Sequence, residues 1–354
     1  MIFNLLTIKD KKQLTDDSVQ LFFDVPVHLQ EAYSYQAGQY LTLEVMGERR
    51  DYSLCSSPKN HEWTIAVKAT KNGKISNYLV KETKIGDQLK VSTPNGRFVI
   101  PSKPNEKRTL LAFAAGSGIT PIMSILEYTL QTEEWVNFYL FYGNRSTKSV
   151  MFCERLNELK LQYPSQLHVF HFYTNDPQED WLFNGRIDAA KFDLILNQLV
   201  DINEVDEAMV CGPEEMIFEL AKSIKNAGII ERHIHFELFN PLTNPKMIFG
   251  DNDSNVNTVE VTVILDNEQH TVTWHKEKNL IDTLLDEDID APYSCKGGIC
   301  SSCLCKVIEG EVNIGENFVL TDSDYKDGLT LACISRPKST KLTLSLIHIS
   351  EPTR

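Results

Sequence analysis

Short runs of alternating apolar and polar residues dominate the amino-terminal part of the chain. Such runs span residues 39–45, 63–69 and 88–92, and the turn-forming sequence Pro-Asn-Gly follows at 94–96. Alternation with a period of two is typical of strands that bury one face, and closely spaced strands of this kind favour an antiparallel barrel or a sandwich. We therefore predict an antiparallel β unit over residues 1–104.

The pattern changes over residues 105–240. Continuous apolar runs alternate here with amphipathic stretches of helical length, such as 122–131. The apolar runs lie at 109–114, 136–142, 167–173 and 208–211. Apolar strands that alternate with helices are typical of an α/β unit built on a parallel sheet, and we predict such a unit here.

A change of composition marks a third unit. The segment between residues 240 and 257 contains two prolines, five asparagines and no sustained apolar periodicity. Pro and Asn are common in turns and loops, so we predict a linker over residues 241–257. The third unit then spans residues 258–343.

Composition narrows the class of protein. The chain has 354 residues, of which 42% are hydrophobic and 24% are charged, as is typical of a soluble globular protein with two or three domains. The net charge of −14 argues against nucleic acid as a partner, because phosphate binding depends on clustered Lys and Arg. The acidic excess is concentrated in residues 251–343, which contain 17 acidic and 8 basic residues. This acidic surface either steers docking onto a basic partner or is merely solvated.

Targeting segments are not evident in the sequence. The amino terminus has no apolar run of signal-peptide length, and nowhere does the chain reach about 18 consecutive apolar residues. We expect a cytoplasmic protein that does not span a membrane.

Cysteines cluster in the third unit. Four of them follow the spacing C-x4-C-x2-C with a distant fourth member, namely Cys295, Cys300, Cys303 and Cys333. Four thiolates can hold two irons and two sulfides, and glycines at 297 and 298 suit a backbone that approaches such a cluster closely. We predict a 2Fe-2S cluster, with buried free thiols or a zinc site as the alternative. Cys305 follows on a predicted strand and is expected to be a packed thiol.

A glycine-rich turn follows the first apolar strand of the α/β unit. It reads A-A-G-S-G-I-T-P over residues 114–121. Glycines let a diphosphate approach the backbone, and the amino terminus of a helix favours negative charge. A single turn of this kind is weak evidence, but Y-G-N-R-S at 142–146 and V-C-G-P at 210–213 end two further strands. Because the carboxyl ends of parallel strands meet at one edge of a sheet, the set favours a nucleotide site there.

The first unit carries R-D-Y-S at 50–53 and G-K-I-S at 73–76. An arginine can hold a pyrophosphate, a tyrosine can pack on a flavin ring, and Ser76 can cap a helix that faces the same phosphates. Taken alone, an arginine like Arg50 is more often a surface charge, and a tyrosine like Tyr52 is more often a core aromatic. The same holds for Arg145, which alone reads as a solvated surface residue.

Together these motifs resemble those of the ferredoxin–NADP reductase superfamily. R-x-Y-S is similar to its flavin motif, G-S-G-I-T-P and C-G-P to its nicotinamide motifs, and C-x4-C-x2-C with a distant cysteine to its plant-type ferredoxin module. The resemblance covers nearly the whole chain. It implies a multidomain fold with an antiparallel β-barrel for FAD, an α/β parallel-sheet domain for NADPH, and an α+β β-grasp ferredoxin domain for the 2Fe-2S cluster.

The resemblance also implies roles for individual residues. The catalytic groups would be Ser53, Cys211 and Glu237. The flavin would be bound by Arg50, Tyr52, Ser53, Ser76 and Phe239. The nicotinamide nucleotide would be bound by Gly116, Gly118, Thr120, Pro121, Arg145, Ser146, Gly212 and Pro213, with Arg145 and Ser146 favouring the 2′-phosphate of NADPH. The cluster ligands would be Cys295, Cys300, Cys303 and Cys333.

Longer runs, such as R-D-Y-S-L-C-S-S-P and P-Y-S-C-K-G-G-I-C, resemble the reductase components of multisubunit ring epoxidases. This resemblance implies that NADPH delivers a hydride to FAD, and that the 2Fe-2S cluster then passes single electrons to a di-iron oxygenase component. A reductase for another di-iron or Rieske oxygenase, or for a desaturase, is the first alternative. A non-enzymatic iron-sulfur sensor is the alternative from another class.

The last residues, 344–354, depart from this pattern. They read L-S-L-I-H-I-S-E-P-T-R, which resembles the translation of a transposon-end adaptor used in sequencing libraries. We therefore predict that residues after Thr343 are not native. The alternative is a genuine strand, because Leu342, Leu344 and Leu346 alternate with polar residues.

Overall fold

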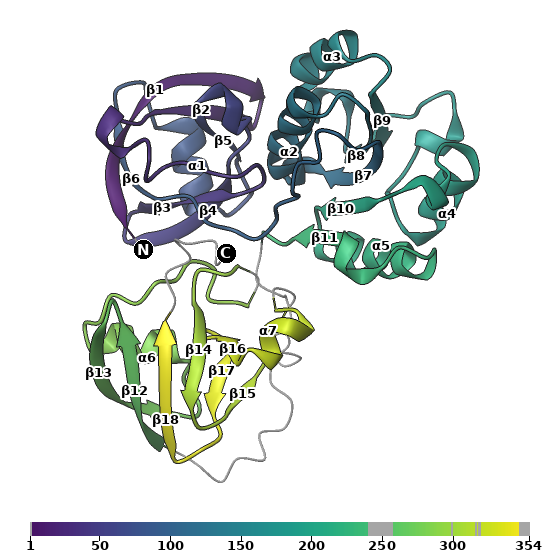
Figure 1. Ribbon diagram of the computed structural model, residues 1–354. Helices are drawn as coiled ribbons and strands as arrows, with labels where there is room; N and C mark the ends of the chain where they lie inside the picture. Colours follow the sequence, from purple (N-terminus) through teal and green to yellow (C-terminus); the bar gives the residue numbers. More distant parts are fainter. Residues whose placement is uncertain (1, 240–257, 299, 316, 318–319, 347–354) are drawn as a thin grey trace.

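The computed structural model describes residues 2–239, 258–298, 300–315, 317 and 320–346. Figure 1 shows a β unit at the amino terminus, an α/β unit beside it, and a third unit below both in this view. The linker predicted at 241–257 lies outside the described residues. Short 3₁₀ turns connect the elements at Val27–Leu29, Pro58–Asn60, Gly116–Gly118, Thr147–Ser149, Trp181–Phe183, Ile202–Glu204 and Glu231–His233.

The first unit is an antiparallel barrel. Its strands are β1 (Phe3–Thr15), β2 (Ser18–Asp24), β3 (Tyr40–Val45), β4 (Glu48–Ser53), β5 (Trp63–Lys68) and β6 (Gln88–Ser92), in the order β4-β3-β6-β1-β2-β5. A bridge between Leu54 and Ile65 joins the two edges of this sheet. Of the two predicted architectures, the barrel is therefore confirmed and the sandwich is not. Alternate strand residues such as Leu6 and Leu21 are fully buried in the interior. Helix α1 (Lys74–Lys81) packs against β5.

The second unit is built on a five-stranded parallel sheet. The strands are β7 (Arg108–Ala115), β8 (Val136–Asn144), β9 (Leu167–Tyr173), β10 (Glu207–Cys211) and β11 (Ile234–Glu237), in the order β11-β10-β7-β8-β9. The helices are α2 (Ile119–Thr132), α3 (Cys153–Gln162), α4 (Ala189–Gln198) and α5 (Glu214–Asn226). The predicted α/β unit with a parallel sheet is confirmed.

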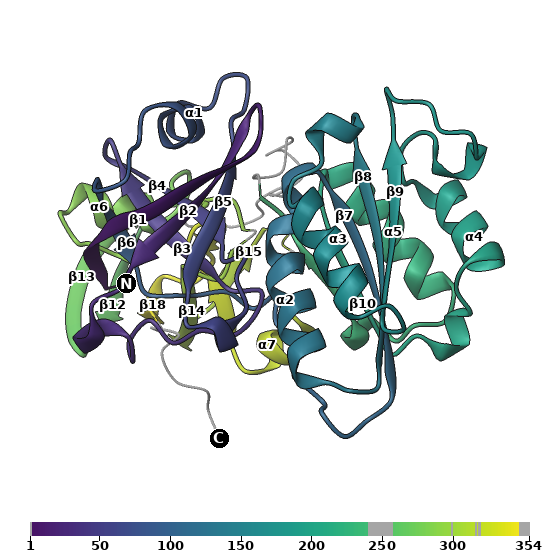
Figure 2. The ribbon, with the colours of Figure 1, turned by 90° about the horizontal axis from the view of Figure 1, so that it is seen from above.

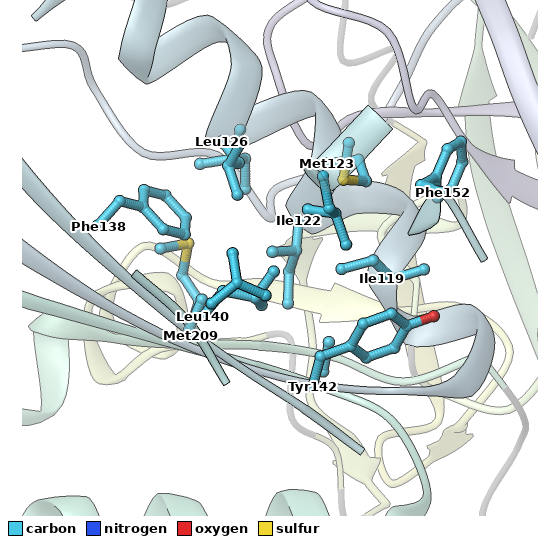
Figure 3. Packing of buried hydrophobic residues seen from close by; sticks show 14 of the residues in the cluster. Ile119, Ile122, Met123, Leu126, Phe138, Leu140, Tyr142, Phe152 and Met209 are labelled. Atoms are coloured by element: carbon cyan, nitrogen blue, oxygen red, sulfur yellow. The ribbon is translucent and has the colours of Figure 1, made fainter. Parts of the chain in front are cut away.

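The helices of the second unit cover both faces of its sheet (Figure 2). Leu110 of β7 packs in one cluster with residues of α2 and α3, whereas its neighbour Leu111 packs in another with residues of α4 and α5. This division follows from the pleat, which turns successive side chains to opposite faces. Figure 3 shows the first cluster, where Ile122 and Met123 of α2 lie over Leu140 of β8.

The third unit combines a mixed sheet with short helices. Its elements are β12 (Thr258–Leu265), β13 (Glu268–His275), α6 (Leu280–Asp286), β14 (Leu304–Glu309), β15 (Val312–Ile314), α7 (Asp322–Lys326), β16 (Leu329–Leu331), β17 (Ser335–Pro337) and β18 (Lys341–Leu346). The sheet order is β13-β12-β18-β14-β16, with β12 and β18 parallel at its centre. Trp274 of β13 is fully buried in a core shared with α6. This arrangement agrees with the predicted α+β ferredoxin fold.

The end of β18 bears on the predicted carboxyl-terminal boundary. The strand continues to Leu346, so a boundary at residue 343 falls inside it. Leu344 and Leu346 are buried in the core of the third unit, as the alternation of leucines requires of a strand. Residues 347–354 lie outside the described part of the chain. The non-native origin of residues 344–354 stays a prediction.

None of the helices in the described part of the chain has the length and apolarity needed to cross a membrane.

Candidate functional site

A cavity of about 1220 Å³ lies where the three units meet. Its walls come from β4 and its neighbours in the first unit, from β11 in the second, and from the loop around Cys295 and Cys300 in the third. This volume exceeds that of most drug-sized ligand sites and suits a dinucleotide. Six sequence-predicted site residues line it: Arg50, Ser53, Glu237, Phe239, Cys295 and Cys300.

Ser53 and Glu237 meet at the wall of this cavity. The Ser53 hydroxyl, at the end of β4, donates a hydrogen bond of 3.1 Å to a carboxyl oxygen of Glu237, at the end of β11. Burial raises the pKa of Glu237 to about 8, so this carboxyl is mostly protonated at neutral pH. Cys211 lies directly opposite Glu237 in the parallel register, and burial raises the pKa of its thiol well above the usual value. The three predicted catalytic residues therefore come together from two units.

The other predicted flavin residues are spread more widely. Arg50 lines the cavity, is half exposed, and is paired with Glu48 at 2.6 Å. Tyr52 packs against the barrel core, as expected if it is a core aromatic residue. Ser76 lies in the first turn of α1, where its hydroxyl donates to the Gly73 carbonyl at 3.3 Å. Tyr52 and Ser76 do not line the cavity described above.

The glycine-rich turns of the second unit pack against each other. Gly118 has no room for a side chain, because a Cβ there would lie 2.1 Å from the Cys211 carbonyl oxygen. Gly212 is similarly restricted, since a Cβ would lie 2.8 Å from the end of Met216 and 3.1 Å from Ala115. Gly116 has φ of +55° and open space above it. The turns that follow β7 and β10 therefore meet at one edge of the sheet, with backbone accessible at Gly116 and with Thr120 and Pro121 buried in the first turn of α2.

The turn after β8 carries both predicted phosphate-binding residues. Arg145 is exposed, and Ser146 caps the following 3₁₀ turn through reciprocal hydrogen bonds with Ser149. Sequence reasoning missed Asp176, which accepts hydrogen bonds from the Thr147 amide at 3.0 Å and its hydroxyl at 2.7 Å. These two bonds hold the pKa of Asp176 below its usual value. The loop after β9 thus places a carboxylate beside the predicted phosphate site.

The four predicted cluster ligands lie together in the third unit. Cys333 interacts with both Cys295 and Cys303, and Cys300 interacts with Cys295. These thiol–thiol contacts, together with burial, raise the pKa of Cys300 and Cys333 well above the usual value. The Gly297 amide donates to the Cys295 sulfur at 3.4 Å, as expected of a loop that offers N–H groups to a cluster.

The donor set fits a two-iron cluster. In the described residues, no group of three or more Cys, His, Asp or Glu side chains converges as the ligands of one metal ion would. A 2Fe-2S cluster divides four thiolates between two irons and so needs no such point of convergence. Cys305 is fully buried in the core of the third unit, in agreement with its prediction as a packed thiol.

The loop that carries these cysteines also contacts the barrel. The Tyr40 hydroxyl of β3 lies 2.8 Å from the Ser302 hydroxyl, and the Asp51 carboxyl of β4 interacts with Ser294. Ion pairs add to this interface, Arg49 with Asp290 at 2.9 Å and Arg97 with Asp324 at 3.0 Å. Sequence reasoning did not predict these contacts, because no local pattern joins residues so far apart in the chain.

Three domain families match the chain in the order of its three units. The oxidoreductase FAD-binding domain matches residues 5–100, the oxidoreductase NAD-binding domain matches residues 113–222, and the 2Fe-2S iron-sulfur cluster binding domain matches residues 263–338. These matches assign FAD, a nicotinamide nucleotide and a 2Fe-2S cluster to the barrel, the α/β unit and the third unit respectively.

Relatives of known function cover almost the whole chain. A component protein of the 1,2-phenylacetyl-CoA epoxidase of Escherichia coli K12 is 36% identical over 341 residues, which cover 95% of each chain. The ferredoxin reductase component of the 3-ketosteroid-9-alpha-monooxygenase of Rhodococcus rhodochrous is 34% identical over 96% of each chain. Among solved structures, phthalate dioxygenase reductase aligns with a TM-score of 0.60 at 24% identity, over 97% of this chain and 98% of that one. That similarity supports the three-unit fold.

Proposed function

The chain belongs to the family of oxidoreductases that join FAD-binding, NAD-binding and 2Fe-2S domains in one polypeptide, and we propose that it is the reductase of a phenylacetyl-CoA ring epoxidase in phenylacetate degradation. Electrons would pass from NADPH through FAD and the 2Fe-2S cluster to a di-iron oxygenase component. One observation carries this proposal: the Ser53–Glu237 pair and two of the cluster cysteines, Cys295 and Cys300, line the same cavity.

The cofactors supply the electron chemistry. FAD accepts two electrons from a nicotinamide as a hydride and releases them singly, which matches a two-electron donor to a one-electron cluster. The cavity fits FAD by its volume and by the cations Arg50, Arg97 and Arg232 on its wall, which can hold a pyrophosphate. The four thiols fit the cluster, as argued above.

The residues of this chain would bind, orient and move protons. Ser53 and the protonated carboxyl of Glu237 offer a hydroxyl and an acidic proton at the cavity wall, and there they would hydrogen-bond to the bound FAD and supply it with a proton. Cys211 would contact the nicotinamide, because its strand end faces Glu237. The remaining predicted contacts with FAD and NADPH come from Arg50, Tyr52, Ser76, Gly116, Gly118, Thr120, Pro121, Arg145, Ser146, Gly212, Pro213 and Phe239.

NADPH is the proposed donor because of the charge around the turn after β8. Arg145 and Lys148 are both exposed there, and both cationic side chains could pair with the 2′-phosphate of NADPH. Asp176 acts against this preference, since its carboxylate occupies the Thr147 amide and hydroxyl. Because the two cationic side chains outnumber the one carboxylate at this turn, the local charge favours binding of the 2′-phosphate of NADPH.

An acidic third unit would help to dock the oxygenase. Part of the acidic surface predicted within residues 251–343 is engaged in ion pairs within the chain: Asp282 pairs with Lys296, Asp286 with Lys278, and Asp290 with Arg49. The carboxylates of Glu287 and Asp288 have no ion pair among the described residues and would be available to a basic partner.

A second candidate keeps the chemistry and changes the partner. The 34% identity to a 3-ketosteroid-9-alpha-monooxygenase reductase component favours a different oxygenase as the electron acceptor. Reconstitution with each candidate oxygenase distinguishes the two, because turnover of phenylacetyl-CoA should need its own di-iron component. Turnover only with another oxygenase would contradict the epoxidase proposal.

The reductase chemistry itself is tested by an absorption spectrum before and after anaerobic addition of NADPH. We expect flavin bands with an iron-sulfur shoulder, both bleached by NADPH. A spectrum that NADPH leaves unchanged would favour the sensor alternative.

A further inference from the structure

Two serines that immediately precede cluster cysteines interact with the barrel. Ser302, before Cys303, lies 2.8 Å from the Tyr40 hydroxyl. Ser294, before Cys295, interacts with the Asp51 carboxyl and helps to lower its pKa against the larger effect of burial. Both ends of the cluster loop, defined here as the described residues 294–298 and 300–303, are therefore attached to neighbouring strands of the first unit.

Tyr40 is held rigidly on the barrel side. Its backbone amide and carbonyl both pair with Asn95, at 2.7 and 2.9 Å. Gly96 packs flat against the ring, because a Cβ at that position would lie 2.9 Å from Tyr40 Cδ1. The side chain is 4% exposed, and burial raises the pKa of its hydroxyl well above the usual value, so the group stays protonated. Tyr40 thus presents a fixed hydroxyl to the loop.

Asp51 is fixed in a similar way. The Thr42 hydroxyl of β3 donates to the Asp51 carboxyl at 2.6 Å, which orients it toward Ser294. Tyr40, Asp51 and Ser53 all line the cavity assigned above to the flavin. The contacts that hold the cluster loop therefore originate in the wall of the flavin site itself.

We propose that Tyr40 and Asp51 are positioning residues for electron transfer within the chain, because they hold the cluster loop against the wall of the flavin cavity through Ser302 and Ser294. This inference rests on the proposed function. Electron transfer falls steeply with the distance between donor and acceptor, so a loop that is released on one side transfers more slowly. The ion pair between Arg49 and Asp290 joins the same units without touching the cluster loop.

The test compares Tyr40→Phe and Ser302→Ala with their double variant. Each single change removes one hydroxyl of the same contact. We expect each to slow cluster reduction after rapid photoreduction of the flavin at least threefold, and the double variant to be no slower than either single one. In Ser302→Ala, whose side chain is not part of the cavity wall, bleaching of the flavin by NADPH should stay within twofold of the wild type, as should direct flavin-to-ferricyanide transfer.

Tyr33→Phe is the matched control. The buried Tyr33 hydroxyl donates to the Val91 carbonyl at 2.7 Å inside the barrel, and it has no hydrogen bond to the described residues of the third unit. Its loss should lower thermal stability as much as Tyr40→Phe, yet leave cluster reduction unchanged. Amide hydrogen exchange without turnover gives a second readout: exchange next to Ser302 should accelerate in Tyr40→Phe and not in Tyr33→Phe.

Several outcomes would overturn the proposal. Unchanged cluster reduction in Tyr40→Phe and Ser302→Ala is one, and equal slowing in Tyr33→Phe is another. A shifted cluster potential or an altered electron paramagnetic resonance (EPR) signal in Ser302→Ala would assign the effect to tuning of the cluster instead of its position. Failure of NADPH to bleach the wild-type flavin would refute the proposed function separately, because photoreduction bypasses NADPH and still measures the internal step.

Discussion

Glu237→Gln tests whether a protonated carboxyl in the cavity takes part in catalysis. The carboxyl accepts a hydrogen bond from Ser53, and burial raises its pKa from the usual 4.5 to about 8. Glutamine keeps the size and can keep the Ser53 contact, but it cannot ionise or supply a proton. The variant therefore separates proton supply from packing.

The magnitude follows from this pKa. With a pKa of about 8, the protonated fraction of Glu237 falls from about 0.9 at pH 7 to about 0.1 at pH 9. A step that needs the proton should slow about tenfold over this range. The same shift affects stability, because the folded chain binds the Glu237 proton more tightly than the unfolded chain does. This contribution to the free energy of unfolding is fully present below pH 4.5 and is lost as the pH rises to about 8. The two pKa values put this loss on the order of 5 kcal/mol.

Flavin reduction is measured by stopped flow, and cytochrome c reduction is measured in the steady state. Both assays are run between pH 6.5 and 9.5 in steps of about half a pH unit. Wild-type turnover should show a break near pH 8 that is absent in Glu237→Gln, and the variant should gain stability relative to wild type as the pH rises. A flat wild-type profile, or a break near pH 8 that persists in the variant, would refute the reasoning.

Three further predictions concern the cluster, the choice of donor and the third unit. Cys303→Ser should abolish cytochrome c reduction while NADPH still bleaches the flavin, and loss of both or neither would contradict the ligand assignment. Arg145→Ala should lower the ratio of kcat/KM for NADPH to that for NADH about tenfold or more. Asp176→Asn, which removes the negative charge beside the Thr147 amide, should raise this ratio, and ratios that do not move would shift the phosphate site elsewhere. Leu344→Ala should destabilise the third unit by about 2 to 5 kcal/mol in urea unfolding, because Leu344 is fully buried, and a neutral effect would remove β18 from the core.

Local patterns predicted the strands and the sheet type well. Alternation at 88–92 coincides with β6, and the apolar run at 109–114 lies within β7. These elements obey a simple rule, since one face or both faces of each strand are buried. The barrel's closure was not predictable in this way, because the bridge between Leu54 and Ile65 depends on how distant strands curl together.

The site was predictable to the extent that its residues sit in local motifs. The cysteines and the glycine-rich turns stand out because their spacing or lack of side chains is visible in the sequence. The contact of Tyr40 with Ser302 joins residues 262 positions apart, and neither residue type is unusual in its own segment. Asp176 was missed for a similar reason: its role depends on the Thr147 amide, which the fold brings to it from the neighbouring strand end.

The central claim is that electrons from NADPH reach the 2Fe-2S cluster by way of the flavin. Low-temperature EPR spectroscopy of the full chain, reduced anaerobically with NADPH and frozen, measures this most directly. The account predicts the signal of a reduced 2Fe-2S cluster in the wild type and its absence after prior removal of FAD. A cluster that dithionite reduces but NADPH leaves silent in the FAD-loaded protein would contradict the account.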